Sequence, residues 1–258
     1  MAQADQPQVK KPSSDSFHFE KPKDWLKAHS SDSDSYTILL QINRTDSAHF
    51  TQMDSVLVPN DPNGDVRFYM PFPMDVPYLD SIHKIIFFSY PAEAFGAYAN
   101  GHLVYAGATN MGRKKDPTPI GFFFTNWKAV ETTSTSNDEW DLHWNFNIDN
   151  KNGIGFHQYD LPGYPASHSC LRLSWKDAAN LYNWADQWIT LGKDSILITG
   201  TPVIIFGNYV FGSPKPWLQL TQNPHSLDIS EDEIKSLTMS HIDSIMLEQR
   251  KRDDQQKK

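Results

Sequence analysis

Hydrophobic and polar residues alternate through the middle of the chain, whereas both ends are mostly polar. Residues 140–148 carry apolar side chains at every second position, a period that predicts a strand with one buried face: Leu142, Trp144, Phe146 and Ile148. Apolar runs with strand composition occur again at 83–90, 195–198 and 201–207. The pattern therefore predicts a mainly β domain that starts near residue 82.

Turn and cap signals add detail to this domain. The dipeptide at 100–101, Asn-Gly, is a hairpin signal between the stretches 92–99 and 102–109. One helix is predicted after Ser174 as its N-cap, because apolar residues recur at helical spacing over 175–189. Many strands with a single firm helix indicate a curved sheet, a sandwich or an open barrel.

Composition divides the chain into four parts. Residues 1–35 are polar and are expected to form an N-terminal tail or linker, and 36–81 a small accessory segment packed on the domain. The β domain itself is expected to occupy 82–220. Residues 221–258 are expected to be a C-terminal helical extension, either a surface helix or a partner-binding helix, and a capping box at 230–233 marks its start.

Charge and hydropathy argue against two classes of partner. The chain of 258 residues has a formal net charge of −8 and no basic stripe, so we expect no nucleic-acid partner. No apolar run is long enough for a transmembrane helix, so no segment is expected to span a membrane. Residues 1–7 lack the apolar core of a signal peptide, which leaves either a cytoplasmic protein or a processed chain.

The only cysteine, Cys170, ends a loop rich in Pro and Gly that also contains His168 and follows His157. A thiol close to an imidazole can form a thiolate–imidazolium pair, which lowers the thiol pKa to between roughly 3.5 and 7.5. The thiolate can attack a carbonyl, and the backbone N–H groups of Ser169 and Cys170 could stabilise the resulting oxyanion. Arg172 shares a face with Cys170 in an extended segment, so it could orient a carboxylate or brace the loop.

Two other interpretations of Cys170 stay open at this point. Free cysteine is among the most buried residue types, so Cys170 could be a purely structural thiol. His157, His168 and Cys170 could instead bind a metal ion, with His143 as a further ligand, although no metal-binding motif supports such a site. Residue types alone do not decide between these alternatives.

Several motifs resemble one protein family in the family's own order. Residues 167–173 read Ser-His-Ser-Cys-Leu-Arg-Leu and closely resemble the Ser-His-Gly-Cys-Ile/Val-Arg-Leu signature of the L,D-transpeptidases (the YkuD, or ErfK/YbiS, catalytic domain). The loop at 161–166, the segment at 112–121 with its Thr-Pro pair and the hairpin at 94–104 are also similar to segments of this family. The resemblance covers about residues 83–207.

This resemblance implies a fold and a pair of reacting groups. The fold would be an L,D-transpeptidase-like β-sandwich or open barrel with a helix after the cysteine loop, together with peripheral helices. Cys170 would be the nucleophile and His157 the base, with the backbone carbonyl of Gln158 orienting the imidazole of His157.

The resemblance also assigns supporting residues. Ser167 and His168 would line the site and Arg172 would support it. Ser169 stands where the signature has Gly, so the loop either keeps angles that Ser tolerates or shapes the oxyanion hole differently. The aromatic residues that could line the cleft are Tyr159, Tyr164, Trp127, Trp140 and Trp144, and each Trp could equally pack in the core.

The implied reaction acts on stem peptides of peptidoglycan. The thiolate would attack the L-centre carbonyl of a tetrapeptide stem, release the terminal D-amino acid and pass the acyl group to an amine of a second stem. Transfer to water would make the protein an L,D-carboxypeptidase, and lost activity would leave a wall-binding protein on the same fold. The resemblance implies no metal and no organic cofactor. A monomer is expected, in the periplasm or cell envelope after removal of a signal peptide.

Overall fold

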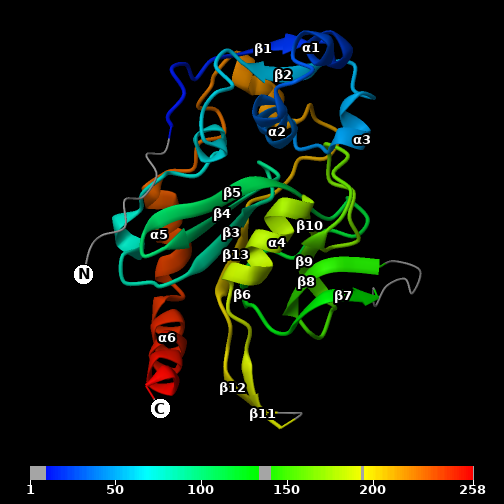
Figure 1. Ribbon diagram of the computed structural model, residues 1–258. Helices are drawn as coiled ribbons and strands as arrows, with labels where there is room; N and C mark the ends of the chain where they lie inside the picture. Colours follow the sequence, from blue (N-terminus) through cyan, green and yellow to red (C-terminus); the bar gives the residue numbers. More distant parts are fainter. Residues whose placement is uncertain (1–9, 134–140, 193–194, 258) are drawn as a thin grey trace.

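The centre of the molecule is one large sheet with smaller elements packed around it (Figure 1). The structure is a computed structural model that describes residues 10–133, 141–192 and 195–257. The nine strands of the sheet follow in spatial order: β6 (Gly121–Phe124), β13 (Pro202–Phe206), β3 (Ile85–Ser89), β4 (Ala94–Ala99), β5 (His102–Asn110), β10 (Leu171–Leu173), β9 (Ile154–Gln158), β8 (Asp141–Asp149) and β7 (Lys128–Thr133). The mainly β fold predicted from the sequence is confirmed.

The sheet curls because its two edge strands are neighbours in the sequence. Only residues 125–127 join β6 to β7, although seven strands lie between them in the sheet. The backbone N–H of Asn126 donates to the carbonyl of Asn147 at 2.7 Å, and the N–H of Asn147 donates to the carbonyl of Trp127 at 3.0 Å. These bonds fix the connection beside β8, and its short length keeps the two edges close together, so the sheet is an open barrel. Two strand pairs are parallel, β13 with β3 and β10 with β9, and the others are antiparallel.

The helix α4 (Trp175–Trp184) covers the apolar interior of the curled sheet, where Phe88, Phe156 and Leu181 are fully buried. Ser174 is its N-cap as predicted, because the Ser174 hydroxyl accepts a hydrogen bond from the backbone N–H of Asp177 at 3.1 Å. The helix ends at Trp184, five residues before the predicted end.

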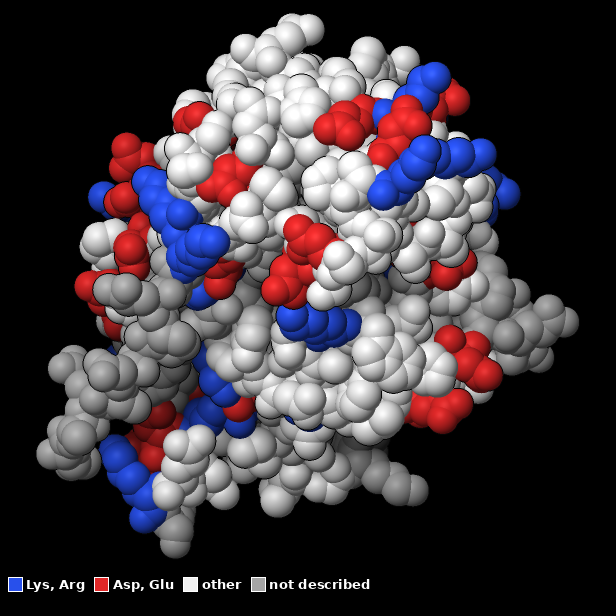
Figure 2. Space-filling view, turned by 45° about the horizontal axis from the view of Figure 1, so that its top comes forward, with Lys and Arg blue, Asp and Glu red and all other residues white. Residues whose placement is uncertain are grey.

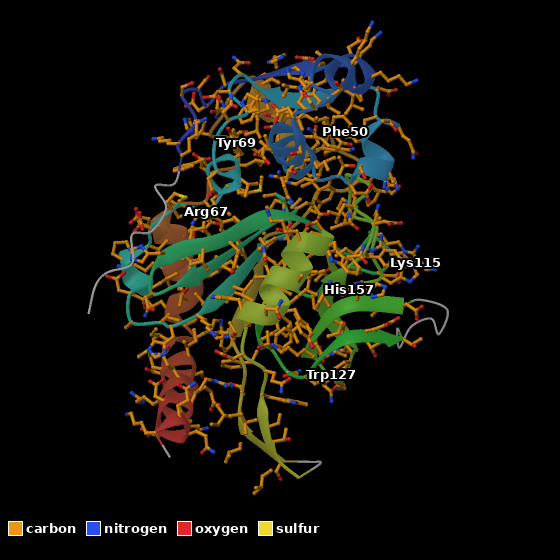
Figure 3. The ribbon with its side chains drawn as sticks, in the orientation of Figure 1. Phe50, Arg67, Tyr69, Lys115, Trp127 and His157 are labelled. Atoms are coloured by element: carbon orange, nitrogen blue, oxygen red, sulfur yellow. The ribbon has the colours of Figure 1, made fainter. Side chains whose placement is uncertain are left out.

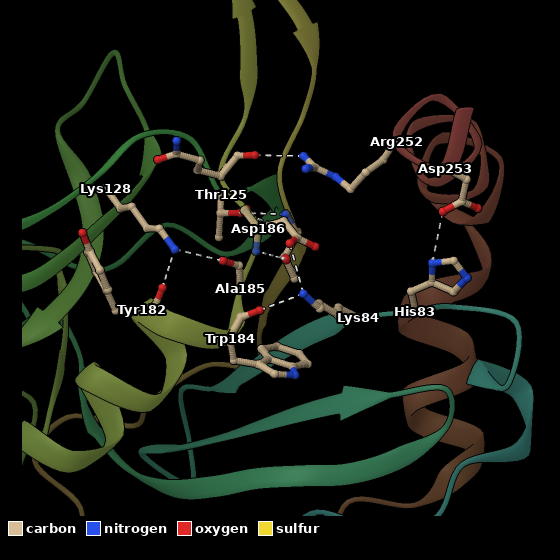
Figure 4. A network of polar contacts seen from close by, with 12 residues as sticks. His83, Lys84, Thr125, Lys128, Tyr182, Trp184, Ala185, Asp186, Arg252 and Asp253 are labelled. Carbon is tan, nitrogen blue, oxygen red and sulfur yellow. Dashed lines mark hydrogen bonds and ion pairs between the residues drawn. The ribbon is translucent and has the colours of Figure 1, made fainter. Parts of the chain in front are cut away.

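Two lysines hold the C-terminal end of α4 (Figure 4). Lys128 Nζ donates to the carbonyl of Tyr182 at 2.5 Å, and Lys84 Nζ donates to the carbonyl of Trp184 at 2.8 Å. Cations near the last turn of a helix bind its unpaired carbonyls and oppose the negative end of its dipole. The chain then turns at Ala185 into extended backbone and continues to the outlying hairpin of β11 (Ile189–Leu191) and β12 (Ser195–Ile198).

The N-terminal elements form a small layer of their own above the sheet in Figure 1. They are β1 (Phe17–Glu20), α1 (Pro22–Ala28), α2 (Ser33–Ile42), α3 (Ser47–Phe50) and β2 (Val56–Pro59), with β1 paired antiparallel to β2. Trp25 is 1% exposed and packs with Leu39, Phe50 and Val56 in a separate apolar cluster. Residues 17–28 are therefore folded, although their polar composition predicted a tail.

The two C-terminal helices and three short 3-10 helices pack on the face of the sheet opposite α4. These elements are η1 (Val66–Tyr69), η2 (Pro77–Leu79), η3 (Pro216–Thr221), α5 (Glu231–Met239) and α6 (Ile242–Gln256). The side chain of Ser230 caps α5, as predicted. Glu248 and Arg252 of α6 bond the backbone of Thr199, and Gln249 bonds the carbonyl of Ser81. Over the described ranges, no helix combines the length and the apolar character needed to cross a membrane.

Charged side chains are dispersed over the face seen in Figure 2. Lys and Arg lie there singly or in small groups, next to Asp and Glu, and wide areas carry no charge. This face has no continuous basic field of the kind that follows a nucleic-acid backbone.

Candidate active site

The candidate site lies where the parallel strands β9 and β10 meet. Their register pairs His157 with Arg172 and Phe156 with Leu171. Because side chains alternate along a strand, Phe156 and Leu171 point into the core, and His157 and Arg172 share the opposite face. Cys170 is two positions before Arg172 and belongs to the same face.

A cavity opens on this face. Seven of the residues predicted from the sequence line it: Cys170, His157, His168, Ser167, Arg172, Tyr159 and Trp127. His157 and Trp127 both lie beside the strands β7 to β9 in Figure 3. A larger cavity of about 560 Å³ lies between residues 11–17, 67–74 and 220–229, but it contains no cysteine. The chemistry of the lining therefore identifies the smaller cavity as the candidate site.

His157 is held as a neutral imidazole. It is 4% exposed, and its Nδ1 lies 2.9 Å from the backbone carbonyl of Gln158, so the expected contact is present. Burial lowers the pKa of His157 to about 4; the Gln158 carbonyl opposes this shift and the charge of Arg172 adds to it. Nδ1 therefore carries the proton that it donates to the carbonyl, and Nε2 is left free to accept one.

The thiol of Cys170 is buried although the residue as a whole is partly exposed. Its Sγ contacts the carbonyl of Gly153 at 3.8 Å. Burial raises the pKa of the thiol, and the backbone N–H of Gly155 and the charge of Arg172 offset only part of this rise. The expectation of a thiol with a lowered pKa, in a thiolate–imidazolium pair, is therefore wrong for this structure. Desolvation disfavours the charged forms of both groups.

The loop before Cys170 has a left-handed turn at Ser169. Ser169 has φ +78°, a conformation that Gly adopts freely and that residues with a Cβ rarely adopt. The loop thus keeps the backbone suited to the glycine of the signature instead of angles favourable to Ser. The hydroxyl of Thr118 donates to the Ser169 carbonyl at 3.0 Å, and the Ser169 hydroxyl donates to the Asp116 carbonyl at 3.3 Å.

Two further contacts concern the backbone next to the thiol. The hydroxyl of Ser167 donates to the carbonyl of Cys170 at 2.5 Å. Within the described parts of the chain, the backbone N–H groups of Ser169 and Cys170 have no acceptor. Both groups remain available to bind an oxyanion.

The guanidinium of Arg172 stands over the ring of Tyr159, with its central carbon 4.4 Å from the ring centroid. It is half-buried in the cavity, and burial lowers its pKa. Among the described residues, no carboxylate or carbonyl bonds this guanidinium, which leaves its N–H donors for an anionic group in the cavity.

Two predicted aromatic residues do not line the cavity. Trp144 has φ +54° and lies in a bulge of β8, so its ring turns onto Trp175 and Tyr182, with centroids 5.9 and 5.4 Å away. Tyr164 is 52% exposed outside the cavity; the side chain of Asn110 bonds its carbonyl, and Lys215 Nζ lies 5.8 Å from the centre of its ring. Trp140 lies outside the described residues.

Three further lining residues of β8 were not predicted from the sequence, and the bulge explains one of them. The alternation predicted that Leu142 shares the core face with Phe146, but the bulge places Leu142 in the cavity. Asn145 and Asn147, both buried, also line the cavity. Two amides at every second position, between apolar neighbours, are a signal that this face of the strand is a polar site.

The alternative of a metal site lacks its further ligand. The ring of His143 packs against Trp175 at 5.3 Å between centroids, and His143 does not line the cavity. Within the ranges that the structure describes, no three His, Cys, Asp or Glu residues are placed to hold a metal ion.

Comparisons with known proteins address the same part of the chain. The family model described as YkuD, the L,D-transpeptidase catalytic domain, matches residues 83–205. No curated protein matches the chain. Residues 83–205 contain all seven predicted residues of the cavity, so the candidate site lies inside the part of the chain that is similar to the L,D-transpeptidase catalytic domain family.

Solved structures that match part of the chain include three L,D-transpeptidases. The one from Stackebrandtia nassauensis has a TM-score of 0.40 at 21% identity, covering 49% of this chain and 57% of that chain. The one from Mycobacterium smegmatis has a TM-score of 0.39 at 20% identity, covering 49% of this chain and 59% of that chain. One from Mycobacterium tuberculosis has a TM-score of 0.38 at 21% identity, covering 49% of this chain and 58% of that chain. The match thus spans less than two thirds of each of these chains.

Proposed function

We propose that this protein is a cysteine L,D-transpeptidase of the cell envelope that acts on peptidoglycan stem peptides. The observation that carries the proposal is the shared cavity of Cys170, His157 and Arg172 inside the part of the chain that matches the L,D-transpeptidase catalytic domain. A nucleophile, a base and a cation that bonds no carboxylate among the described residues are the groups needed for acyl transfer from a peptide that carries carboxylates.

The first half-reaction forms an acyl-enzyme. Neutral His157 takes the thiol proton on Nε2 as Cys170 Sγ attacks the L-centre carbonyl of the donor stem. The backbone N–H groups of Ser169 and Cys170 bind the oxyanion of the tetrahedral intermediate. The C–N bond then breaks, His157 returns the proton to the leaving amine, and a D-amino acid departs.

The second half-reaction regenerates the thiol. An amine of a second stem attacks the thioester, gives a proton to His157 and displaces Cys170, which recovers the proton. In this scheme Arg172 binds a carboxylate of the stem peptide, and Tyr159 and Trp127 line its path. Ser167 holds the Cys170 carbonyl, and His168 completes the wall of the cavity.

Incubation with disaccharide tetrapeptide and mass spectrometry of the products tests the proposal. We expect cross-linked dimer and free D-amino acid from the wild type, and neither from Cys170→Ala or His157→Gln. His143→Gln is the matched control, because that imidazole lies outside the cavity. Tripeptide without dimer would identify an L,D-carboxypeptidase, and identical products from wild type and Cys170→Ala would refute cysteine catalysis.

A further inference from the structure

The loop that precedes Cys170 is held by a segment from outside the matched domain. The backbone N–H of Asp46 donates to the carbonyl of Leu161 at 3.0 Å, and the N–H of Leu161 donates to Asp46 Oδ2 at 2.7 Å. Thr45 also forms an isolated antiparallel bridge with Pro162. A bond to a carboxylate is charge-assisted and stronger than one between neutral groups.

Asp46 is itself held in one position. Its other oxygen, Oδ1, accepts hydrogen bonds from the backbone N–H of His49 at 3.0 Å and from the His49 ring at 2.7 Å, so it caps α3. Just before it, Asn43 joins α2 to β2 through hydrogen bonds with the N–H and the carbonyl of Leu57 at 2.8 Å each. The two oxygens of Asp46 therefore connect a rigid turn to the loop.

Arg44 is connected to residues 166–167, the second part of the same loop, through a series of hydrogen bonds. Its guanidinium is fully buried, and Nε donates to the carbonyl of Ala92 at 2.7 Å. The next residue, Glu93, accepts from the N–H of Met111 at 3.1 Å through its carboxylate. The carbonyl of Met111 in turn accepts from the N–H groups of Ala166 and Ser167, at 3.1 and 3.0 Å.

We propose that residues 43–49 are a clamp that fixes the loop between His157 and Cys170, and that Asp46 is a positioning residue for the thiol. The clamp acts at a distance from the reacting atoms, because Asp46 does not line the cavity. Without it the Pro- and Gly-rich start of the loop loses its anchor, and the thiol moves relative to the base. The effect on catalysis rests on the proposed function, whereas the effect on the loop does not.

Substitution by serine separates the clamp from the helix cap. In Asp46→Ser the hydroxyl can still cap α3, but the shorter side chain cannot also reach Leu161. Asp32→Ser is the matched control, because Asp32 caps the neighbouring helix α2 through the N–H of Ser35. Hydrogen exchange of the amides of 161–169 is measured for both variants, beside the strand amides of β3 and β4.

We expect Asp46→Ser to speed exchange in 161–169 by roughly tenfold or more, with β3 and β4 unchanged, and Asp32→Ser to leave the loop as it is. In the transpeptidase assay we expect kcat to fall about tenfold with KM within about twofold, since the reacting atoms and not the binding surface are displaced. Unchanged loop exchange, or equal acceleration throughout the sheet, would overturn the clamp. Because the exchange measurement needs no turnover, it tests the clamp even if the protein proves inactive.

Discussion

Ser169 combines a side chain with a backbone conformation that suits glycine. The left-handed region costs a residue with a Cβ about 1–2 kcal/mol, and a β-branched side chain suffers most. The signature of the family therefore revealed which position is special, but the residue itself did not reveal its φ. A Ser in this place is compatible with several turn conformations, and only the folded loop selects one.

We expect the free energy of unfolding to decrease from Ser169→Gly through the wild type to Ser169→Val, which should be about 2 kcal/mol less stable than Ser169→Gly. Urea unfolding of the three proteins measures the order. The same change at an exposed serine with ordinary φ, Ser55→Gly, should give no gain, because there glycine only adds freedom to the unfolded chain. A Val variant as stable as the Gly variant would show that φ at 169 is not left-handed.

His157 predicts a specific pH dependence of stability. Its folded pKa of about 4 lies below the ordinary value of 6.5, so the unfolded chain binds more protons between these values. The free energy of unfolding should therefore fall as the pH drops from about 6.5 toward 4, by up to about 3 kcal/mol from this residue. Urea titrations at pH 7.5 and 5 should show a smaller loss for His157→Gln than for wild type. An equal loss in both would exclude His157 as the cause.

At the scale of elements, α4 shows which boundary of a helix the local sequence pattern can predict. Its start was predictable because Ser174 lies directly before the first helical turn, and its capping bond is local. Its end was not, since apolar residues continue at helical spacing after Trp184. The helix stops where Lys84, directly before β3, and Lys128, the first residue of β7, bind its last carbonyls, and both lysines are distant from the helix in the sequence.

Ser174→Ala should cost about 1–2 kcal/mol of stability, which is at the upper end for an N-cap. The hydroxyl accepts from the N–H of Asp177 and donates to its carboxylate at 2.6 Å, and Gln41 also bonds this buried carboxylate. The loss of Ser174 leaves a buried acceptor short of a partner. Ser230→Ala removes an exposed N-cap from α5 and should cost less. Thermal unfolding of the two variants compares them, and equal costs would contradict the importance of the buried carboxylate.

Strand β8 shows the opposite case, in which a regular pattern concealed an irregular element. The alternation of Leu142, Trp144 and Phe146 predicted one buried face, and the bulge divides that face between core and cavity. A bulge adds one residue to a strand without requiring a special residue type, so the sequence carried no mark of it. Leu142 lines the cavity because of this single shift, whereas Asn145 and Asn147 lie opposite Phe146 and Ile148 by the ordinary alternation.

For the whole molecule, the fold class was predictable and the order of the strands was not. Apolar runs identified strands, and the resemblance placed Cys170 and His157 in one site. Nothing local indicated that β13 inserts between β6 and β3, or that Asp46 bonds Leu161 across 115 positions of sequence. Such pairings depend on how distant segments fit together, which one sequence does not encode in any short window.

The central position of β13 in the sheet has a consequence for how the chain folds during synthesis. β13 is the last strand of the large sheet to leave the ribosome, yet β3 and β6 pair with it on either side. Until residues 202–206 emerge, β3 has an unpaired edge and β6 has no neighbour in the sheet. The cysteine loop is translated earlier but lies in an unclosed barrel. The loop between His157 and Cys170 therefore reaches its final surroundings only after residues 202–206 have paired with β3 and β6.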